Sequence, residues 1–150
     1  MQNRLGEALV LDGFLPYRLS VLTNHVSSAL ASRYAEDFSL SAAEWRVMAA
    51  LGGSAGLSAS EVCLRTAMDK VQVSRAVANL VENGRVVRRA DAEDGRVTRL
   101  TLSAAGRAVY DEIVPRAKEF EARLVSVLTS EEQVALDAIL KKLTRSVLSL

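Results

Sequence analysis

The stretch from Asp69 to Leu102 constrains the fold most, because it encodes a capped helix followed directly by a hairpin. Asp69 can accept hydrogen bonds from the free N–H groups of a first helical turn, and Gln72 can reach back to the backbone of Asp69. Gly84 supplies a residue that tolerates the left-handed conformation at a helix end. The pattern therefore predicts a short amphipathic helix from Asp69 to Gly84. Its buried stripe comprises Val73, Ala76, Val77 and Leu80.

The remaining surface of this predicted helix carries side chains that can pair with the edges of DNA bases. It contains few acids, and its members are Lys70, Gln72, Ser74, Arg75 and Asn79. A solvated polar face is the alternative interpretation. We favour contact with a DNA major groove, because the segment that follows the helix is also basic.

That following segment predicts a β-hairpin. Val86–Ala90 and Val97–Leu102 are short runs with β-branched residues, and Asp94-Gly95 between them is a turn signal. Four arginines lie on or beside the hairpin: Arg88, Arg89, Arg96 and Arg99. An arginine at a hairpin tip can enter a minor groove, where narrow walls concentrate negative potential. For any single arginine the alternative is a solvated surface charge.

The order of these elements resembles the multiple-antibiotic-resistance regulator (MarR) family. The specific pieces are Asp69-Lys70-x-x-Val73-Ser74-Arg75 and Asp91-x-x-Asp94-x-Arg96, followed by a Leu-Thr-Leu-Ser-x-x-Gly segment. The resemblance runs from about Pro16 to the C-terminus. Many members carry Asp-Arg-Arg where this chain has Asp94-Gly95-Arg96, so the role of the wing-tip arginine is carried over only to Arg96.

The resemblance implies a dimeric, ligand-responsive transcription factor, most often a repressor, that binds a pseudo-palindromic operator. The residues expected to contact bases or nearby phosphates in the major groove are Gln72, Ser74, Arg75 and Asn79. Phosphates would be held by Lys70, Arg88, Arg89 and Arg99. Arg96 would enter the minor groove, with Asp94 orienting it by an ion pair.

The expected fold class is mainly α with a small β-hairpin, a winged helix-turn-helix with long N- and C-terminal dimerisation helices. Two further capping pairs, Ser41 with Glu44 and Ser58 with Glu61, predict the helices that precede the Asp69 helix. We expect a single domain over residues 1–150. Within it, residues 40–102 would form the DNA-binding lobe, and residues 16–36 and 103–150 would be dimerisation helices that bind a second copy of the chain.

The net charge of +1 conceals an uneven distribution. Residues 1–64 carry 4 basic and 6 acidic residues, residues 65–102 carry 8 and 5, and residues 103–150 carry 7 and 7. The excess positive charge therefore lies in the helix and hairpin, as a phosphate-binding surface requires. No apolar run approaches the length of a membrane span, and a single cysteine cannot form an internal disulfide. We expect a cytoplasmic protein that binds double-stranded DNA and no membrane.

The sequence offers no convincing catalytic set, metal site or cofactor motif, so we expect no enzyme. His25 has no neighbours at metal-ligand spacing, and Cys63 is interpreted as a buried thiol. Relatives often bind small aromatic acids between the DNA-binding lobe and the dimer helices. The candidates for such a pocket are Phe14, Tyr17, Arg18, Trp45 and Arg46. The stronger interpretation is that Trp45 and Phe14 are core residues and that the arginines are solvated. A small-molecule or redox sensor, or a protein-docking module, remains the alternative to specific DNA binding.

Overall fold

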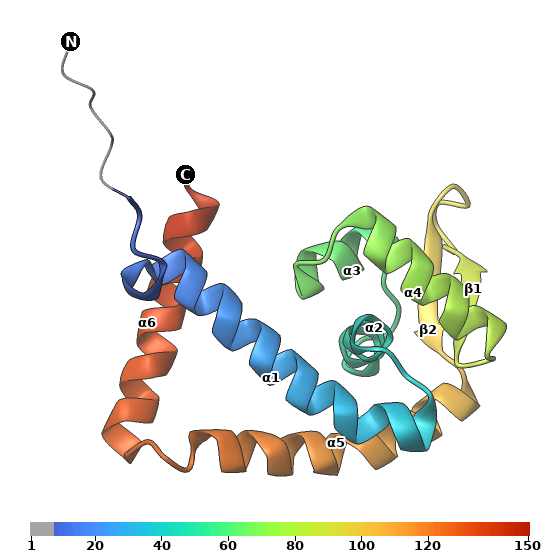
Figure 1. Ribbon diagram of the computed structural model, residues 1–150. Helices are drawn as coiled ribbons and strands as arrows, with labels where there is room; N and C mark the ends of the chain where they lie inside the picture. Colours follow the sequence, from blue (N-terminus) through green and yellow to red (C-terminus); the bar gives the residue numbers. More distant parts are fainter. Residues whose placement is uncertain (1–7) are drawn as a thin grey trace. The chain divides into compact units, whose positions relative to one another are not determined.

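The computed structural model describes residues 8–150, apart from the side chain of Ala35. Residues 1–7 of the predicted single domain lie outside the described residues. Six α-helices, one short 3-10 helix and one antiparallel hairpin follow each other in the described part, which confirms the expected fold class (Figure 1). The elements are η1 (Leu11–Gly13), α1 (Leu15–Phe38), α2 (Ala42–Gly52), α3 (Ala59–Thr66), α4 (Lys70–Glu82), β1 (Val86–Ala90), β2 (Thr98–Leu102), α5 (Ala104–Val125) and α6 (Ser130–Leu148).

The chain forms two compact units, divided between Tyr110 and Asp111. The first unit contains the segment expected to be the DNA-binding lobe, residues 40–102. Its core is built on α2, α3, α4 and the hairpin, which pack against each other (Figure 1). The predicted stripe of α4 is buried, together with Val47, Met48 and Leu51 of α2. Each of the valine, leucine and methionine side chains among them contributes roughly 1.5–3 kcal/mol through burial.

Helix starts in the first unit follow the capping signals. Reciprocal capping boxes form at Ser58 with Glu61 and at Asp69 with Gln72. Ser41 accepts a hydrogen bond from the backbone N–H of Glu44, as expected, at 3.1 Å. The Glu44 carboxylate has a different position from the one expected: it is 8% exposed, and its Oε1 accepts from the side chain of Asn79 at 3.4 Å.

The hairpin pairs Val86 with Leu102 and Ala90 with Thr98. Strand β1 has the predicted bounds, whereas β2 begins one residue later than predicted. The N–H of Val97 donates to the carbonyl of Asp94 at 3.0 Å, so Val97 belongs to the turn. Leu57, which precedes α3, forms two backbone hydrogen bonds with Leu100, at 3.1 and 2.7 Å. The hairpin is therefore joined to the helix-turn-helix at the middle of β2.

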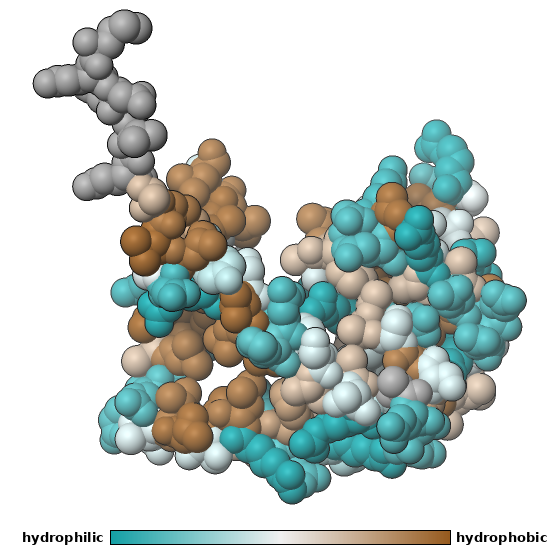
Figure 2. Space-filling model, in the orientation of Figure 1, coloured by the Kyte–Doolittle hydropathy of each residue, from teal (hydrophilic) through white to brown (hydrophobic). Residues whose placement is uncertain are grey.

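The second unit, residues 111–150, contains most of α5 and all of α6. Thr129 and Glu132 form a reciprocal capping box at the start of α6. Helix α6 has no buried residue, and it carries six exposed aliphatic side chains: Val134, Leu136, Ile139, Leu140, Val147 and Leu148. Figure 2 shows hydrophobic surface over this helix. Within residues 8–150, no helix is both long enough and apolar enough to span a lipid bilayer.

Candidate nucleic-acid interface

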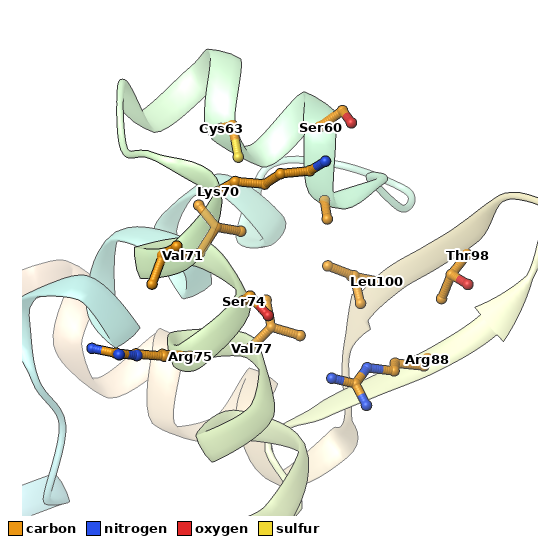
Figure 3. Close-up of a pocket in the computed structure, with 12 residues that line it drawn as sticks. Ser60, Cys63, Lys70, Val71, Ser74, Arg75, Val77, Arg88, Thr98 and Leu100 are labelled. Atoms are coloured by element: carbon orange, nitrogen blue, oxygen red, sulfur yellow. The ribbon is translucent and has the colours of Figure 1, made fainter.

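An open groove of about 790 Å³ lies between α3, α4 and the hairpin (Figure 3). It is lined by Ala59, Ser60, Cys63, Lys70, Val71, Val73, Ser74, Arg75, Val77, Arg88, Thr98 and Leu100. Helix α4 supplies half of these residues, and the hairpin supplies the opposite wall. The helix and the hairpin that the sequence predicted to bind DNA therefore face a common groove.

The predicted contacts of α4 differ in their availability. Lys70, Ser74 and Arg75 are exposed. Figure 3 shows that the Arg75 side chain points away from Arg88, on the opposite side of α4. Gln72 is exposed as well, but its side-chain oxygen accepts from the N–H of Asp69 at 3.3 Å. Its side-chain NH₂ group can still donate to a base.

Asn79 lies further along α4 and does not line the groove. Its side-chain nitrogen donates to Glu44 Oε1 at 3.4 Å, which links α4 to α2. This contact gives Asn79 a role in packing the two helices, a role that the sequence did not predict. The structure thus brings Lys70, Ser74 and Arg88 together and leaves Asn79 apart from them.

The wing tip presents Arg96, whose side chain is 92% exposed. Its Nε lies 3.2 Å from Asp94 Oδ1, so the ion pair that was predicted to orient Arg96 is present. Asp94 also accepts from the backbone N–H of Arg96, at 3.1 Å. The guanidinium also contacts Asp94 through Nη2, which lies 3.5 Å from Oδ2. Asp94 therefore holds one edge of the guanidinium, and its remaining N–H groups are open to solvent or to a groove of DNA.

Arg99 occupies a different environment from the one expected for a phosphate-binding residue. Its Nε donates to Asp91 Oδ2 at 2.6 Å, and its Nη1 donates to Glu61 Oε2 at 2.8 Å. Two of its donors therefore bind carboxylates of the same chain, and the phosphate contact of Arg99 stays a prediction. Arg88 and Arg89 of β1 remain exposed, and Arg88 lines the groove.

The pKa values of this cluster reflect its contacts. The hydrogen bond from Arg99, helped by those from the backbone N–H groups of Glu93 and Asp94, lowers the pKa of Asp91 to about 2. The backbone hydrogen bond from Ser58, and then the contact with Arg99, lower the pKa of Glu61. The two carboxylates raise the pKa of Arg99. All three groups are therefore charged at neutral pH.

Sequence reasoning missed Glu61 and Asp91 as partners of Arg99, and it missed Val71. The side chain of Val71 is 58% exposed and lines the groove between the polar residues of α4. A signal for Val71 was present: it falls outside the buried stripe of α4, so a valine there has to be exposed. No comparable signal links Glu61 to Arg99, because they lie 38 residues apart.

Two of the five predicted ligand-pocket residues lie together. Trp45 and Arg46 line a cavity of about 350 Å³ whose other walls come from α1, α2 and α3. Arg46 Nη2 donates to Ser27 Oγ at 2.7 Å, and Arg65 is a second cation beside the cavity. Phe14, Tyr17 and Arg18 are exposed near the start of α1 and do not line this cavity.

Other candidate chemistry is limited in residues 8–150. No group of three or more His, Cys, Asp or Glu in that range could hold a metal ion. His25 is exposed on α1. Cys63 is partly exposed at the edge of the groove, and the expectation that it is fully buried was wrong.

The helix-turn-helix, the wing and the groove between them define a winged helix-turn-helix protein. Residues 38–97 match the sequence profile of the MarR family. The chain is 30% identical over 132 residues to HTH-type transcriptional repressor Rv2887 of Mycobacterium tuberculosis, which covers 87% of this chain and 91% of that protein. The chain therefore belongs to the MarR family of winged-helix transcriptional regulators. Regulators of this kind are generally not enzymes.

Solved structures agree with this assignment. A MarR/EmrR family transcriptional regulator from Acinetobacter sp. ADP1 superimposes with a TM-score of 0.88, at 25% identity, over 95% of this chain and 100% of that one. BpsR of Bordetella bronchiseptica, whose structure concerns the regulation of its DNA binding by 6-hydroxynicotinic acid, gives a TM-score of 0.79. It is 25% identical, over 91% of this chain and 97% of that one.

Proposed function

We propose that this regulator is a homodimeric, ligand-responsive repressor that binds a pseudo-palindromic operator. The observation that carries the proposal is the groove in which the exposed face of α4 and the basic strand β1 meet. Lys70 and Arg88 place positive charge on its two walls, and Ser74 lies between them (Figure 3). Such an arrangement can hold a phosphate backbone while α4 reads the bases.

In this proposal α4 enters the major groove and the wing reaches the adjacent minor groove. Gln72, Ser74 and Arg75 would contact base edges, and Lys70, Arg88 and Arg89 would contact phosphates. Arg96, held by Asp94, would enter the minor groove. Asn79 and Arg99 contribute through their contacts within the protein.

The dimer would bury the apolar surface that each unit exposes. In the first unit this surface includes Leu11, Phe14 and Leu15, and in the second it lies along α6. A two-fold axis would place the two copies of α4 about one DNA turn apart (~34 Å), which matches the half-sites of a pseudo-palindrome.

The cavity at Trp45 supports the proposal that this repressor responds to a ligand. It is large enough for a small aromatic ring, and Arg46 and Arg65 lie beside it to neutralise a carboxylate. The BpsR structure concerns regulation by 6-hydroxynicotinic acid, a small aromatic acid. We therefore propose that the effector of this protein belongs to the same chemical class.

Binding of the purified protein to DNA from upstream of its own gene tests the proposal. The assay would compare this DNA with an unrelated fragment over a series of salt concentrations. We expect a steep loss of affinity with salt and a strong preference for one pseudo-palindromic segment. Binding with a salt dependence but without preference, or no binding at low salt, would contradict the proposed function.

A further inference from the structure

We propose that Arg99 is a positioning residue that relays the position of α3 to the wing-tip arginine, Arg96. The inference rests on the proposed DNA binding and assigns Arg99 a role other than phosphate contact. It follows from hydrogen bonds that link five residues in sequence between the helix-turn-helix and the wing tip: Glu61, Arg99, Asp91, Asp94 and Arg96. The link from Asp91 to Asp94 runs through the backbone N–H of Asp94.

The relay begins at the first turn of α3. Glu61 Oε2 accepts from the backbone N–H of Ser58 at 2.8 Å as part of the capping box, and the same oxygen accepts from Arg99 Nη1 at 2.8 Å. The capping box holds the Glu61 carboxylate in one position relative to α3. A guanidinium bound to that oxygen is therefore fixed relative to the helix.

The second link joins Arg99 to the turn of the wing. Arg99 Nε donates to Asp91 Oδ2 at 2.6 Å. The other oxygen of Asp91, Oδ1, accepts from the backbone N–H groups of Glu93 and Asp94, at 2.8 and 3.2 Å. Asp91 thus shapes the turn with one oxygen while Arg99 holds the other.

The third link reaches the wing tip. Asp94, whose N–H is held by Asp91, accepts from both the backbone N–H and the Nε of Arg96. The direction of the exposed Arg96 side chain therefore depends on Asp94, which depends on the turn that Asp91 and Arg99 hold.

The cluster of Glu61, Asp91 and Arg99 differs from an isolated surface ion pair in two respects. The Arg99 side chain is 36% exposed and that of Asp91 is 18% exposed, so water screens the shorter contact only partly. In addition, one planar guanidinium binds two carboxylates from different elements, which fixes its orientation. The backbone pairing of Leu57 with Leu100 fixes the middle of β2, and the cluster then sets the direction of the outer half of the hairpin.

A double-mutant cycle separates a relay from a direct phosphate contact. Operator affinity would be measured for the wild-type dimer, Arg99→Gln, Arg96→Ala and the double variant. We expect each single variant to lose about tenfold in affinity, and Arg99→Gln to lose less than about twofold more in the Arg96→Ala background. Losses that multiply, with a salt slope lowered by about two in both backgrounds (about one for each Arg99 of the dimer), would overturn the inference in favour of a phosphate contact.

Removal of an acidic charge gives a second test, in which the relay and simple electrostatics predict opposite changes in DNA affinity. Asp91→Asn and Glu61→Gln make the protein more positive, so simple electrostatics predicts tighter DNA binding, whereas the relay predicts weaker binding. The matched control is Glu93→Gln, because it removes the same charge from the exposed turn while the relay uses only the backbone N–H of Glu93. Tighter binding by Asp91→Asn and by the Glu93→Gln control alike would overturn the relay.

A readout without DNA completes the test. In Arg99→Gln we expect faster hydrogen exchange at the amides of Glu93 and Asp94, with unchanged protection in the core of α4. Unchanged exchange at the turn would overturn the inference. A wild-type protein that binds no specific DNA would overturn the proposed function as well, whereas multiplicative losses in a protein that binds well would overturn only the relay.

Discussion

Val71 presents an apolar side chain on the outer face of α4, between polar residues that are predicted to contact DNA. The 5-methyl group of thymine is the apolar feature that a major groove offers. We predict that Val71→Ala weakens operator binding about fivefold, through the loss of roughly 1 kcal/mol of apolar contact. The measurement is operator affinity for the variant and the wild type, with thymines in each half-site replaced singly by uracil.

The uracil series makes this prediction specific. One replacement should weaken binding of the wild-type protein and have no effect on Val71→Ala, because the variant no longer contacts that methyl group. Val71→Thr is the matched control, since it keeps the shape of valine and one methyl group. Equal affinity of the wild type for every thymine and uracil operator would show that Val71 does not read a methyl group.

The cluster around Arg99 gives stability a dependence on pH. Contacts in the folded protein lower the pKa of Asp91 from 3.8 to about 2 and lower that of Glu61 from 4.5. A carboxylate whose pKa is lower in the folded state stabilises the protein fully above its unfolded pKa, and this contribution is lost as the pH falls through its folded pKa.

The stability difference between the wild type and Arg99→Gln should therefore be constant above about pH 5 and shrink as the pH falls from about 4 toward 2. Thermal unfolding of both proteins over this range measures the difference. If the stability difference between the two proteins stays constant down to pH 2, Arg99 does not stabilise the charged forms of Asp91 and Glu61.

At the scale of single elements, Gly106 in the first turn of α5 shows how closely two segments approach. A Cβ on Gly106 would clash with the backbone carbonyl of Arg85, which cannot move as a flexible side chain would. Alanine normally favours a helix over glycine, but the clash reverses the sign here. We predict that Gly106→Ala lowers the free energy of unfolding by about 1–3 kcal/mol, measured by chemical denaturation.

Gly53 provides the matched control for this substitution. It lies at the C-cap of α2 with φ −95°, and a Cβ there would meet nothing within 4 Å. Gly53→Ala should therefore leave stability unchanged or raise it by up to about 1 kcal/mol. If both substitutions change the free energy of unfolding equally, the close approach of α5 to the Arg85 carbonyl does not explain the glycine at position 106.

The elements themselves were largely predictable, because their signals are local. Ser58 and Asp69 begin their helices where the capping patterns predict, and β1 has the predicted bounds. The site was less predictable, because its contacts cross between elements. Glu61 and Arg99 are joined only once the hairpin lies against α3, and Asn79 meets Glu44 only once α4 packs on α2. A pattern read along the chain contains neither pair.

At the scale of the whole molecule, the exposed aliphatic surface is larger than a monomer needs. Helix α6 has no buried residue, although Leu136, Ile139 and Leu140 recur at helical spacing on it. Large apolar patches on a soluble protein mark interaction surfaces. The regular spacing and the proposed two-fold dimer together suggest that α6 packs against a second copy of the chain.

Ile139→Asp tests this interface, because a buried and unpaired carboxylate costs about 3–5 kcal/mol, which weakens dimerisation by a factor on the order of 10²–10⁴. Sedimentation analysis should show a dimer for the wild type and a monomer for the variant at micromolar concentration. Ala138→Asp introduces the same charge on the opposite, exposed side of α6 and should remain dimeric.

A monomeric variant should also lose most of its operator affinity, because two half-sites are bound tightly only when the two recognition helices are linked. A dimeric Ile139→Asp would place the interface elsewhere on the chain.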